Sequence, residues 1–121
     1  MTKTILVVED QEDNRQILRD LLGATDYEMV EAENGQQAID AVAKQKPDLI
    51  LMDIQLPVMD GYEATRRIKA NPDWNAIPII VVTSYALSGD AEKARAAGCD
   101  DYVTKPYSPR QLLAKIKEYL K

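Results

Sequence analysis

The sequence predicts an α/β fold: a doubly wound, five-stranded parallel sheet with helices on both faces. Short apolar runs alternate along the chain with segments of helical periodicity, which is typical of βα units on a parallel sheet. Four of the apolar runs end directly in a charged or hydroxyl side chain, as expected where strands deliver polar groups to one edge of a sheet. The chain has 121 residues, so we expect a single domain spanning 1–121.

Five segments are predicted as strands, and their composition orders them within the sheet. The segments 4–9, 48–53 and 77–83 are apolar almost throughout, as expected where helices cover both faces of a sheet. The segments 27–32 and 100–104 carry charged residues, so we expect them at the edges. Three central and two edge strands give the order 2-1-3-4-5, which is already known from flavodoxin-like proteins.

Five segments are predicted as helices, at 13–24, 35–45, 60–70, 87–97 and 109–120. The first helix has an apolar stripe at helical spacing, made of Ile17, Leu18, Leu21 and Leu22. The last helix begins with a capping-box pattern, Ser108-Pro109-Arg110-Gln111. The helix at 87–97 has the least apolar bulk, because its inward positions are Ala91, Ala94 and Ala97. Alanine buries little area, so we expect this helix to be held weakly.

The chain contains no histidine, and this excludes several kinds of chemistry. Ser-His-Asp catalysis and Cys-His catalysis both need an imidazole. Zinc sites with histidine ligands need it too. The chain itself cannot carry a phosphohistidine. Any reaction that uses a phosphohistidine would therefore have to take it from a partner protein.

Composition also limits the location and the partners of the chain. The single cysteine, Cys99, excludes an internal disulfide and favours a reducing cytoplasm. The formal charge of −5 argues against direct nucleic-acid binding. No apolar run approaches the roughly 20 residues that a membrane-spanning helix needs, so we expect no membrane insertion.

Acidic residues follow two of the central strands. Because the carboxyl ends of parallel strands share one edge of the sheet, Glu9, Asp10 and Asp53 are expected to meet in a crevice there. Three carboxylates in one cleft repel each other, and a divalent cation removes the conflict. Hard oxygen ligands predict Mg²⁺, with Mn²⁺ as the alternative. We expect Asp10 and Asp53 to bind the metal through their side chains. Glu9 is expected to act through a water molecule, or by contacting the ligands and not the metal itself.

Asp53 is the candidate nucleophile, because an aspartate carboxylate can form an acyl phosphate. Phosphoryl transfer mainly requires positioning and neutralisation of the phosphoryl oxygens. Lys105 offers a mobile positive charge for this, and its place directly after a strand sets it apart from an ordinary surface lysine. Thr83 offers a hydroxyl, although it also fits an ordinary strand residue of high β-propensity.

Taken together, these segments resemble a response-regulator receiver domain, similar to the stand-alone chemotaxis and cell-cycle receivers. The resemblance covers essentially the whole chain, and the order and spacing of the pieces make it specific. The matching segments are Ile5-Leu6-Val7-Val8-Glu9-Asp10, Met52-Asp53 with Pro57-Val58-Met59-Asp60-Gly61, Ile77-Pro78-Ile79-Ile80 with Thr83, and Gly98-Cys99-Asp100-Asp101-Tyr102 with Lys105-Pro106.

The resemblance implies a role for each residue of the acid pocket. Asp53 would be the phosphoacceptor, and Lys105 would contact the phosphoryl group. The metal would be held by Glu9, Asp10, Asp53 and the backbone carbonyl of Gln55. The Lys105–Pro106 bond would be cis, which the sequence alone does not predict because few X–Pro bonds are.

The resemblance also implies a switch beside the pocket. Thr83 would be the switch hydroxyl and Tyr102 the switch aromatic, which turns inward on activation. Gln55 and Tyr85 occupy variable positions that tune the phosphoryl lifetime in the family. Ser84 stands where the family usually has alanine, and we expect it to tune the site together with Tyr85. A bulky Tyr85 would hinder an attacking water, which predicts a long-lived phosphoaspartate. Its competing interpretation is a side chain that faces solvent or a partner.

A sensor histidine kinase or a histidine phosphotransfer protein would supply the phosphoryl group. Phosphorylation would switch the surface 84–108, and a downstream target would bind the face formed by the segments 87–97, 100–104 and 109–120. We expect a monomer or weak dimer that catalyses only its own phosphorylation and slow dephosphorylation, without metabolite turnover. The alternative is an N-terminal receiver module cut from a larger regulator with an output domain.

Three other classes fit the sequence less well. A dehalogenase-like phosphohydrolase would carry a second acid two residues after the nucleophile, where this chain has Gln55. A flavodoxin-like cofactor binder would need a glycine-rich phosphate loop in place of Glu9-Asp10. A receiver-like scaffold that is never phosphorylated would not need the acid pocket and Lys105.

Overall fold

The computed structural model describes residues 2–83 and 90–120. Its centre is a five-stranded parallel sheet with the order β2-β1-β3-β4-β5, as the sequence predicts. The strands are β1 Thr4–Val8, β2 Glu28–Ala32, β3 Leu49–Asp53, β4 Ile79–Thr83 and β5 Asp101–Thr104. Each lies within its predicted segment and is one or two residues shorter.

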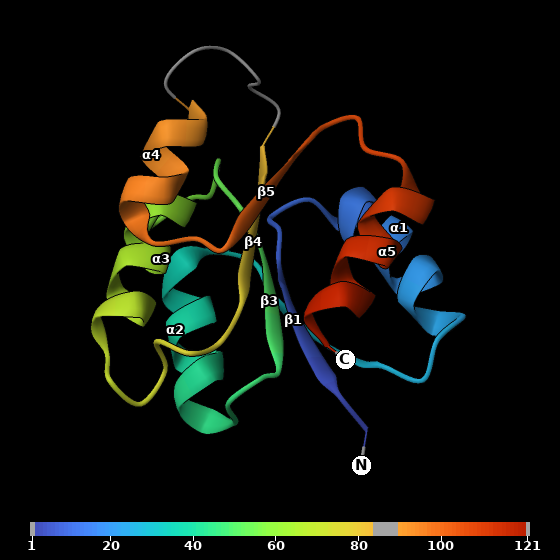
Figure 1. Cartoon of the computed structure of the whole chain (residues 1–121), viewed down its shortest axis with the longest axis horizontal. Coiled ribbons are helices and arrows are strands. Elements are labelled where there is room, and N and C mark those ends of the chain that lie inside the picture. The colour runs from blue at the N-terminus through green and yellow to red at the C-terminus, as the bar shows by residue number, and fades with distance from the viewer. Residues whose placement is uncertain (1, 84–89, 121) are drawn as a thin grey trace.

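Helices cover both faces of the sheet. They are α1 Glu12–Gly23, α2 Gly35–Lys44, α3 Gly61–Ala70, α4 Asp90–Ala97 and α5 Pro109–Tyr119. Figure 1 shows α1 and α5 on one face and α2, α3 and α4 on the other. The predicted helix 87–97 is confirmed from Asp90 onwards, and its first three positions lie outside the described residues.

The three central strands are buried along their whole length, which confirms their predicted place in the sheet. Alternate residues point to opposite faces. Ile5 and Leu49 pack with α1 and α5, whereas Leu6 and Ile50 pack with the helices of the other face. The strands β2 and β5 are partly exposed, as expected of edge strands.

Side-chain caps set the starts of three helices. The side-chain oxygens of Asn34, Asp60 and Ser108 each accept a hydrogen bond from the backbone N–H three residues later, at 2.8, 2.9 and 3.3 Å. The cap at Ser108 confirms the predicted start of α5, where Pro109 is the first helical residue. The capped start of α3 lies directly after the loop that follows β3.

The predicted apolar stripe of α1 is wrong at Ile17. Leu18 and Leu22 are buried, but Ile17 is 50% exposed. A helix turns by about 100° per residue, so positions 15, 18 and 22 share one face and Ile17 falls outside it. The third inward residue is Arg15, which is 8% exposed.

Within residues 2–83 and 90–120, none of the helices has the length and apolar character that crossing a bilayer requires.

Candidate functional site

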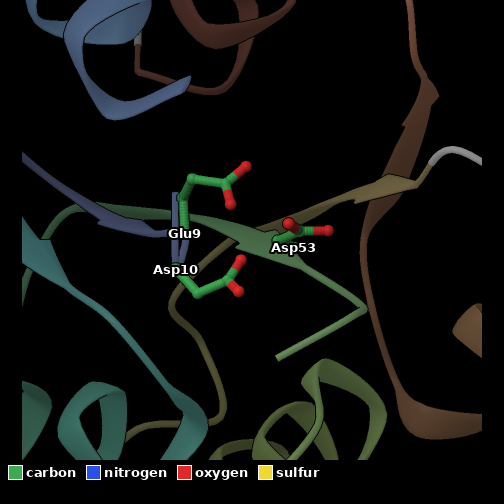
Figure 2. A group of neighbouring side chains, drawn as sticks. All are labelled: Glu9, Asp10 and Asp53. Carbon is green, nitrogen blue, oxygen red and sulfur yellow. The ribbon is translucent and has the colours of Figure 1, made fainter. Parts of the chain in front are cut away.

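The carboxyl ends of β1 and β3 bring three acids together. Asp53 is the last residue of β3, and Glu9 and Asp10 directly follow β1. The two strands are neighbours, with Val8 paired to Met52, so the acids that follow leave the sheet side by side. Figure 2 shows Glu9 and Asp10 leaving β1 and Asp53 leaving β3. One oxygen from each of the three carboxylates lies within 4.8 Å of the others.

Lys105 reaches this acid cluster from the carboxyl end of the edge strand β5. It directly follows β5, and its backbone N–H donates to the carbonyl oxygen of Thr83 at 2.7 Å. Its Nζ lies 3.0 Å from Glu9 Oε1 and 3.3 Å from Asp53 Oδ2. The Lys105–Pro106 bond is cis, as the resemblance implied. The ammonium thus offsets part of the negative charge of the cluster.

The environment of Asp53 opposes its ionisation. The residue is only 7% exposed. Burial, and then the negative charge of Glu9, raise the pKa of Asp53 to about 6, although Lys105 acts in the opposite direction. At neutral pH the carboxylate is therefore mostly ionised but poorly solvated. Strongly perturbed acids of this kind are common at functional sites.

The pKa values of the other groups shift in different directions. Slight burial of its carboxyl group, and then the neighbouring Glu9, raise the pKa of Asp10. Burial also acts to raise the pKa of Glu9, but the N–H of Gln11 and the Lys105 ammonium outweigh it and hold that pKa below its ordinary value. The pKa of Lys105 is raised, because the charges of Asp53 and Glu9 outweigh its burial. Glu9 and Lys105 therefore form the firmly ionised pair of the site.

The acid cluster lines a small cavity of about 280 Å³, together with Gln11, Asn14 and Gln55. Its metal-binding groups are hard oxygens, which suit Mg²⁺ and Mn²⁺ rather than a softer metal. The predicted residue Gln55 is therefore brought to the same place as the acids. The residues present fit a hydrated divalent cation.

Thr83 and Tyr102 lie on the neighbouring strands β4 and β5. Thr83 is the last residue of β4 and is 4% exposed. Tyr102 is half-buried on β5, is paired with Val81, and packs against the core cluster that also contains Ala94 of α4. The predicted inward positions Ala94 and Ala97 are both buried. The predicted residues Ser84 and Tyr85 lie outside the described residues.

Gly61, the first residue of α3, is packed directly against the end of β3. A Cβ at this position would collide with the backbone carbonyl oxygen of Asp53 and also come within 2.9 Å of Ile54 Cα. The N–H of Gly61 donates to the carbonyl of Ile54 at 2.9 Å. Gly61 belongs to the segment Pro57-Val58-Met59-Asp60-Gly61 that resembles the receiver family. Its close contact with Asp53 could not be predicted from the sequence pattern.

A second, more apolar cavity of about 520 Å³ opens beside the acid cluster, between α1 and the segment that follows β5. Asp53 and Lys105 lie at one side of it, and Ile17 and Tyr107 line its wall. The exposed Ile17 therefore lies at this cavity, next to the buried Leu18. The cavity was not predicted from the sequence, because a helical stripe does not reveal which apolar residue faces a gap.

Known proteins resemble the chain over its whole length. The family model for the response regulator receiver domain matches residues 5–117. The polar-differentiation response regulator DivK of Brucella anthropi is 43% identical over 120 residues, which cover 99% of this chain and 98% of that protein.

Two solved structures are similar to the fold. The receiver domain of the sensor histidine kinase PA1611 of Pseudomonas aeruginosa, with a magnesium ion in its active site cleft, is 37% identical with a TM-score of 0.92 and coverage of 99% and 98%. The receiver domain of the response regulator Ssk1 from Saccharomyces cerevisiae, crystallised with the histidine phosphotransfer protein Ypd1, is 33% identical with a TM-score of 0.90 and coverage of 98% and 88%. The chain belongs to the response regulator receiver domain family.

Proposed function

We propose that this receiver domain is the phosphoacceptor of a two-component phosphorelay, in which Asp53 takes a phosphoryl group from a phosphohistidine of a partner protein. One observation carries the proposal. The Asp53 carboxylate lies in a cluster of acids that suits Mg²⁺ and within 3.3 Å of the Lys105 ammonium. Phosphoryl transfer to a carboxylate needs positive charge beside the phosphoryl oxygens, and here a metal ion and the Lys105 ammonium would supply it.

In the proposed reaction, an oxygen of Asp53 attacks the phosphorus atom. The O–P bond forms as the P–N bond to the histidine breaks, and the bonding electrons leave with the imidazole nitrogen. The Asp53 carboxylate is the nucleophile and needs no general base, because it is already ionised at neutral pH. Lys105 Nζ neutralises charge on the transferred phosphoryl oxygens.

The metal ligands would be Glu9, Asp10, Asp53 and the backbone carbonyl of Gln55. A bound Mg²⁺ supplies positive charge that stabilises the phosphoryl oxygens during transfer, and Mn²⁺ is the alternative. The three carboxylates that meet at the small cavity support this assignment. The magnesium ion in the similar PA1611 receiver supports it as well.

The proposed output is a change in the surface 84–108. Thr83 would respond to the phosphoryl group and Tyr102 would turn inward, which would shift α4 against β5 and α5. The small buried side chains Ala94 and Ala97 support a weakly held α4. A downstream protein would recognise the α4, β5 and α5 face. Ser84 and Tyr85 would tune the phosphoryl lifetime, and we expect a long-lived phosphoaspartate.

The proposed donor is a sensor histidine kinase or a histidine phosphotransfer protein, because this chain has no histidine of its own. The similarity to the Ssk1 receiver, crystallised with Ypd1, supports this kind of donor. We propose that the domain 1–121 works in the cytoplasm without metabolite turnover, as a monomer or weak dimer. The match to DivK over nearly its whole length supports a stand-alone regulator.

Radiolabelled acetyl phosphate tests the assignment of the phosphoacceptor. The wild-type protein should take up acid-stable, base-labile label in Mg²⁺ and almost none in EDTA. Asp53→Asn should take up none, while its circular dichroism spectrum remains that of the wild type. Equal labelling of Asp53→Asn and wild type would mean that another residue accepts the phosphoryl group.

A further inference from the structure

Arg15, near the start of α1, is a charged residue on the buried side of its helix. Its side chain is only 9% exposed. Its Nη1 donates a buried hydrogen bond of 2.8 Å to the backbone carbonyl oxygen of Glu9. Through this side chain, α1 is tied to the segment that carries the acids Glu9 and Asp10.

Carboxylates outside the acid cavity hold the rest of the guanidinium. Nε donates to Glu31 Oε1 on β2 at 3.1 Å, and Nη2 donates to Glu12 Oε2 at 2.6 Å. Glu33 Oε1 lies 3.6 Å from Nη2. A planar guanidinium bound on several sides has little freedom to rotate. The carboxylates on α1, on β2 and after β2 therefore fix the direction in which the guanidinium donates its hydrogen bond to Glu9.

The carbonyl that Arg15 binds belongs to the peptide unit between Glu9 and Asp10. A peptide unit is planar, so fixing its carbonyl also fixes its nitrogen and the Cα of Asp10. The N–H of Glu9 is held from the other side, because it donates to the carbonyl of Ala32 at 2.9 Å. Asp10 follows the end of β1 and is exposed, so little side-chain packing holds it in place. Its orientation therefore depends on these backbone hydrogen bonds.

Stability alone does not explain a guanidinium at this place. Replacing a buried ion network with apolar side chains of similar volume is often neutral or stabilising. Leu18 and Leu22 already supply the apolar contacts of the same helix face. What an apolar side chain cannot supply is the N–H that meets the Glu9 carbonyl.

We propose that Arg15 is a positioning residue for metal binding, holding the Glu9–Asp10 peptide so that the Asp10 carboxylate meets those of Glu9 and Asp53. This inference rests on the proposed function, since it concerns how the acid cluster binds Mg²⁺. Arg15 acts through the backbone and from outside the cavity. Its loss should therefore weaken metal binding rather than abolish the chemistry at Asp53.

Mn²⁺ binding to the whole chain tests the inference, with free Mn²⁺ measured by electron paramagnetic resonance. Arg15→Met keeps much of the side-chain volume and removes every donor, and we expect about tenfold weaker binding. Labelling by acetyl phosphate should need correspondingly more Mg²⁺ for half its maximal rate. The rate at saturating Mg²⁺ should stay close to that of the wild type, a pattern that a loss of stability alone does not produce.

Arg19→Met is the matched control. Arg19 binds Glu31 and Glu12, two of the carboxylates that also hold Arg15, but its hydrogen bonds go to side chains on α1 and β2 and not to the Glu9 carbonyl. This variant should bind Mn²⁺ as the wild type does. Arg15→Gln, which removes the charge but leaves a polar side chain, should bind Mn²⁺ more weakly and is decisive if Arg15→Met does not fold.

The outcomes separate this inference from the proposed function. Wild-type affinity in a folded Arg15→Met or Arg15→Gln variant would overturn the inference and leave the proposed function intact. Equal weakening by Arg19→Met would also overturn it, because the ion pairs in general would then be responsible. A wild-type protein that binds neither Mn²⁺ nor Mg²⁺ would overturn both.

Discussion

Asp53 carries its negative charge in a place where both burial and Glu9 oppose it, so the folded state holds it at a cost in stability. Its pKa of about 6, against an ordinary value of 3.8, amounts to at most about 3 kcal/mol when each unit is about 1.4 kcal/mol. An asparagine of the same shape would avoid this cost. The proposed chemistry requires the carboxylate, which explains why an unfavourable group occupies the end of a buried strand.

Asp53→Asn should therefore stabilise the protein, and the gain should depend on pH. A raised carboxyl pKa means that the folded state binds its proton more tightly, so the wild type loses stability as the pH rises through the window from about 4 to about 6. The difference in free energy of unfolding between Asp53→Asn and wild type should grow across that window and stay level above it. Urea unfolding in EDTA at several pH values measures this, and a difference independent of pH would contradict it.

Val58 holds its backbone in a conformation that suits valine poorly. Its φ is 69°, in the left-handed region, and its side chain is 83% exposed. Asparagine adopts this region more easily, so Val58→Asn should raise the free energy of unfolding by about 1 kcal/mol. In strand β2, Val30→Asn should have the opposite effect. Urea unfolding of both variants checks the pair, and a loss of stability in Val58→Asn would show that the loop is not strained there.

At the scale of elements, the start of α3 is pressed against the end of β3, and two glycines make a matched test of that contact. A Cβ at Gly61 would collide with the Asp53 carbonyl, whereas one at Gly23 has nothing within 4 Å. Gly61→Ala should lower the free energy of unfolding by about 1–3 kcal/mol through overpacking and slow labelling of Asp53 by acetyl phosphate. Gly23→Ala should raise that free energy by a few tenths to about 1 kcal/mol and leave labelling unchanged. Equal labelling by both variants would mean that β3 tolerates the shift.

Helix α1 places the exposed Ile17 at the apolar cavity that Asp53 also lines, so we expect a protein that donates a phosphoryl group to Asp53 to contact it. Ile17→Asn should slow transfer from such a donor by about tenfold, the equivalent of roughly half of a buried isoleucine side chain. Labelling by acetyl phosphate, which needs no protein contact, should be unchanged. Val30→Thr, at an exposed valine of β2 that does not line the cavity, should slow neither reaction. Unchanged donor transfer in Ile17→Asn would place the docking surface elsewhere.

At the scale of the whole molecule, the architecture could be predicted because two simple patterns specify it. Fully apolar runs such as 49–52 belong to strands covered on both faces, and strand ends in a parallel sheet share one edge. These rules were enough to bring Glu9, Asp10 and Asp53 together and to add Lys105. The pairing of Lys105 Nζ with both Glu9 and Asp53 could not be predicted, because it depends on the three-dimensional path of the segment after β5.

Two features of the molecule lay beyond sequence reasoning for a physical reason. Arg15 was missed because hydropathy treats a charged residue as exposed, whereas a guanidinium can be buried when its donors are satisfied. Ile17 was wrongly expected in the core because it lies at one edge of the apolar stripe of α1, and the stripe alone does not show that the buried face is centred nearer to Arg15. Both depend on contacts between elements that are distant in sequence.

Mg²⁺ should stabilise the whole fold, because its proposed ligands come from the segment after β1, the end of β3 and the segment after β3, which unfold together in a small domain. Binding to the folded state alone should add about 1.4 kcal/mol to the free energy of unfolding at ten times the dissociation constant. The increase should be larger for wild type than for Asp10→Asn, which lacks one ligand, and Na⁺ at equal ionic strength should not reproduce it. Urea unfolding with Mg²⁺ or EDTA measures the effect. If Asp10→Asn gained as much as wild type, the acid cluster would not be the site through which Mg²⁺ acts.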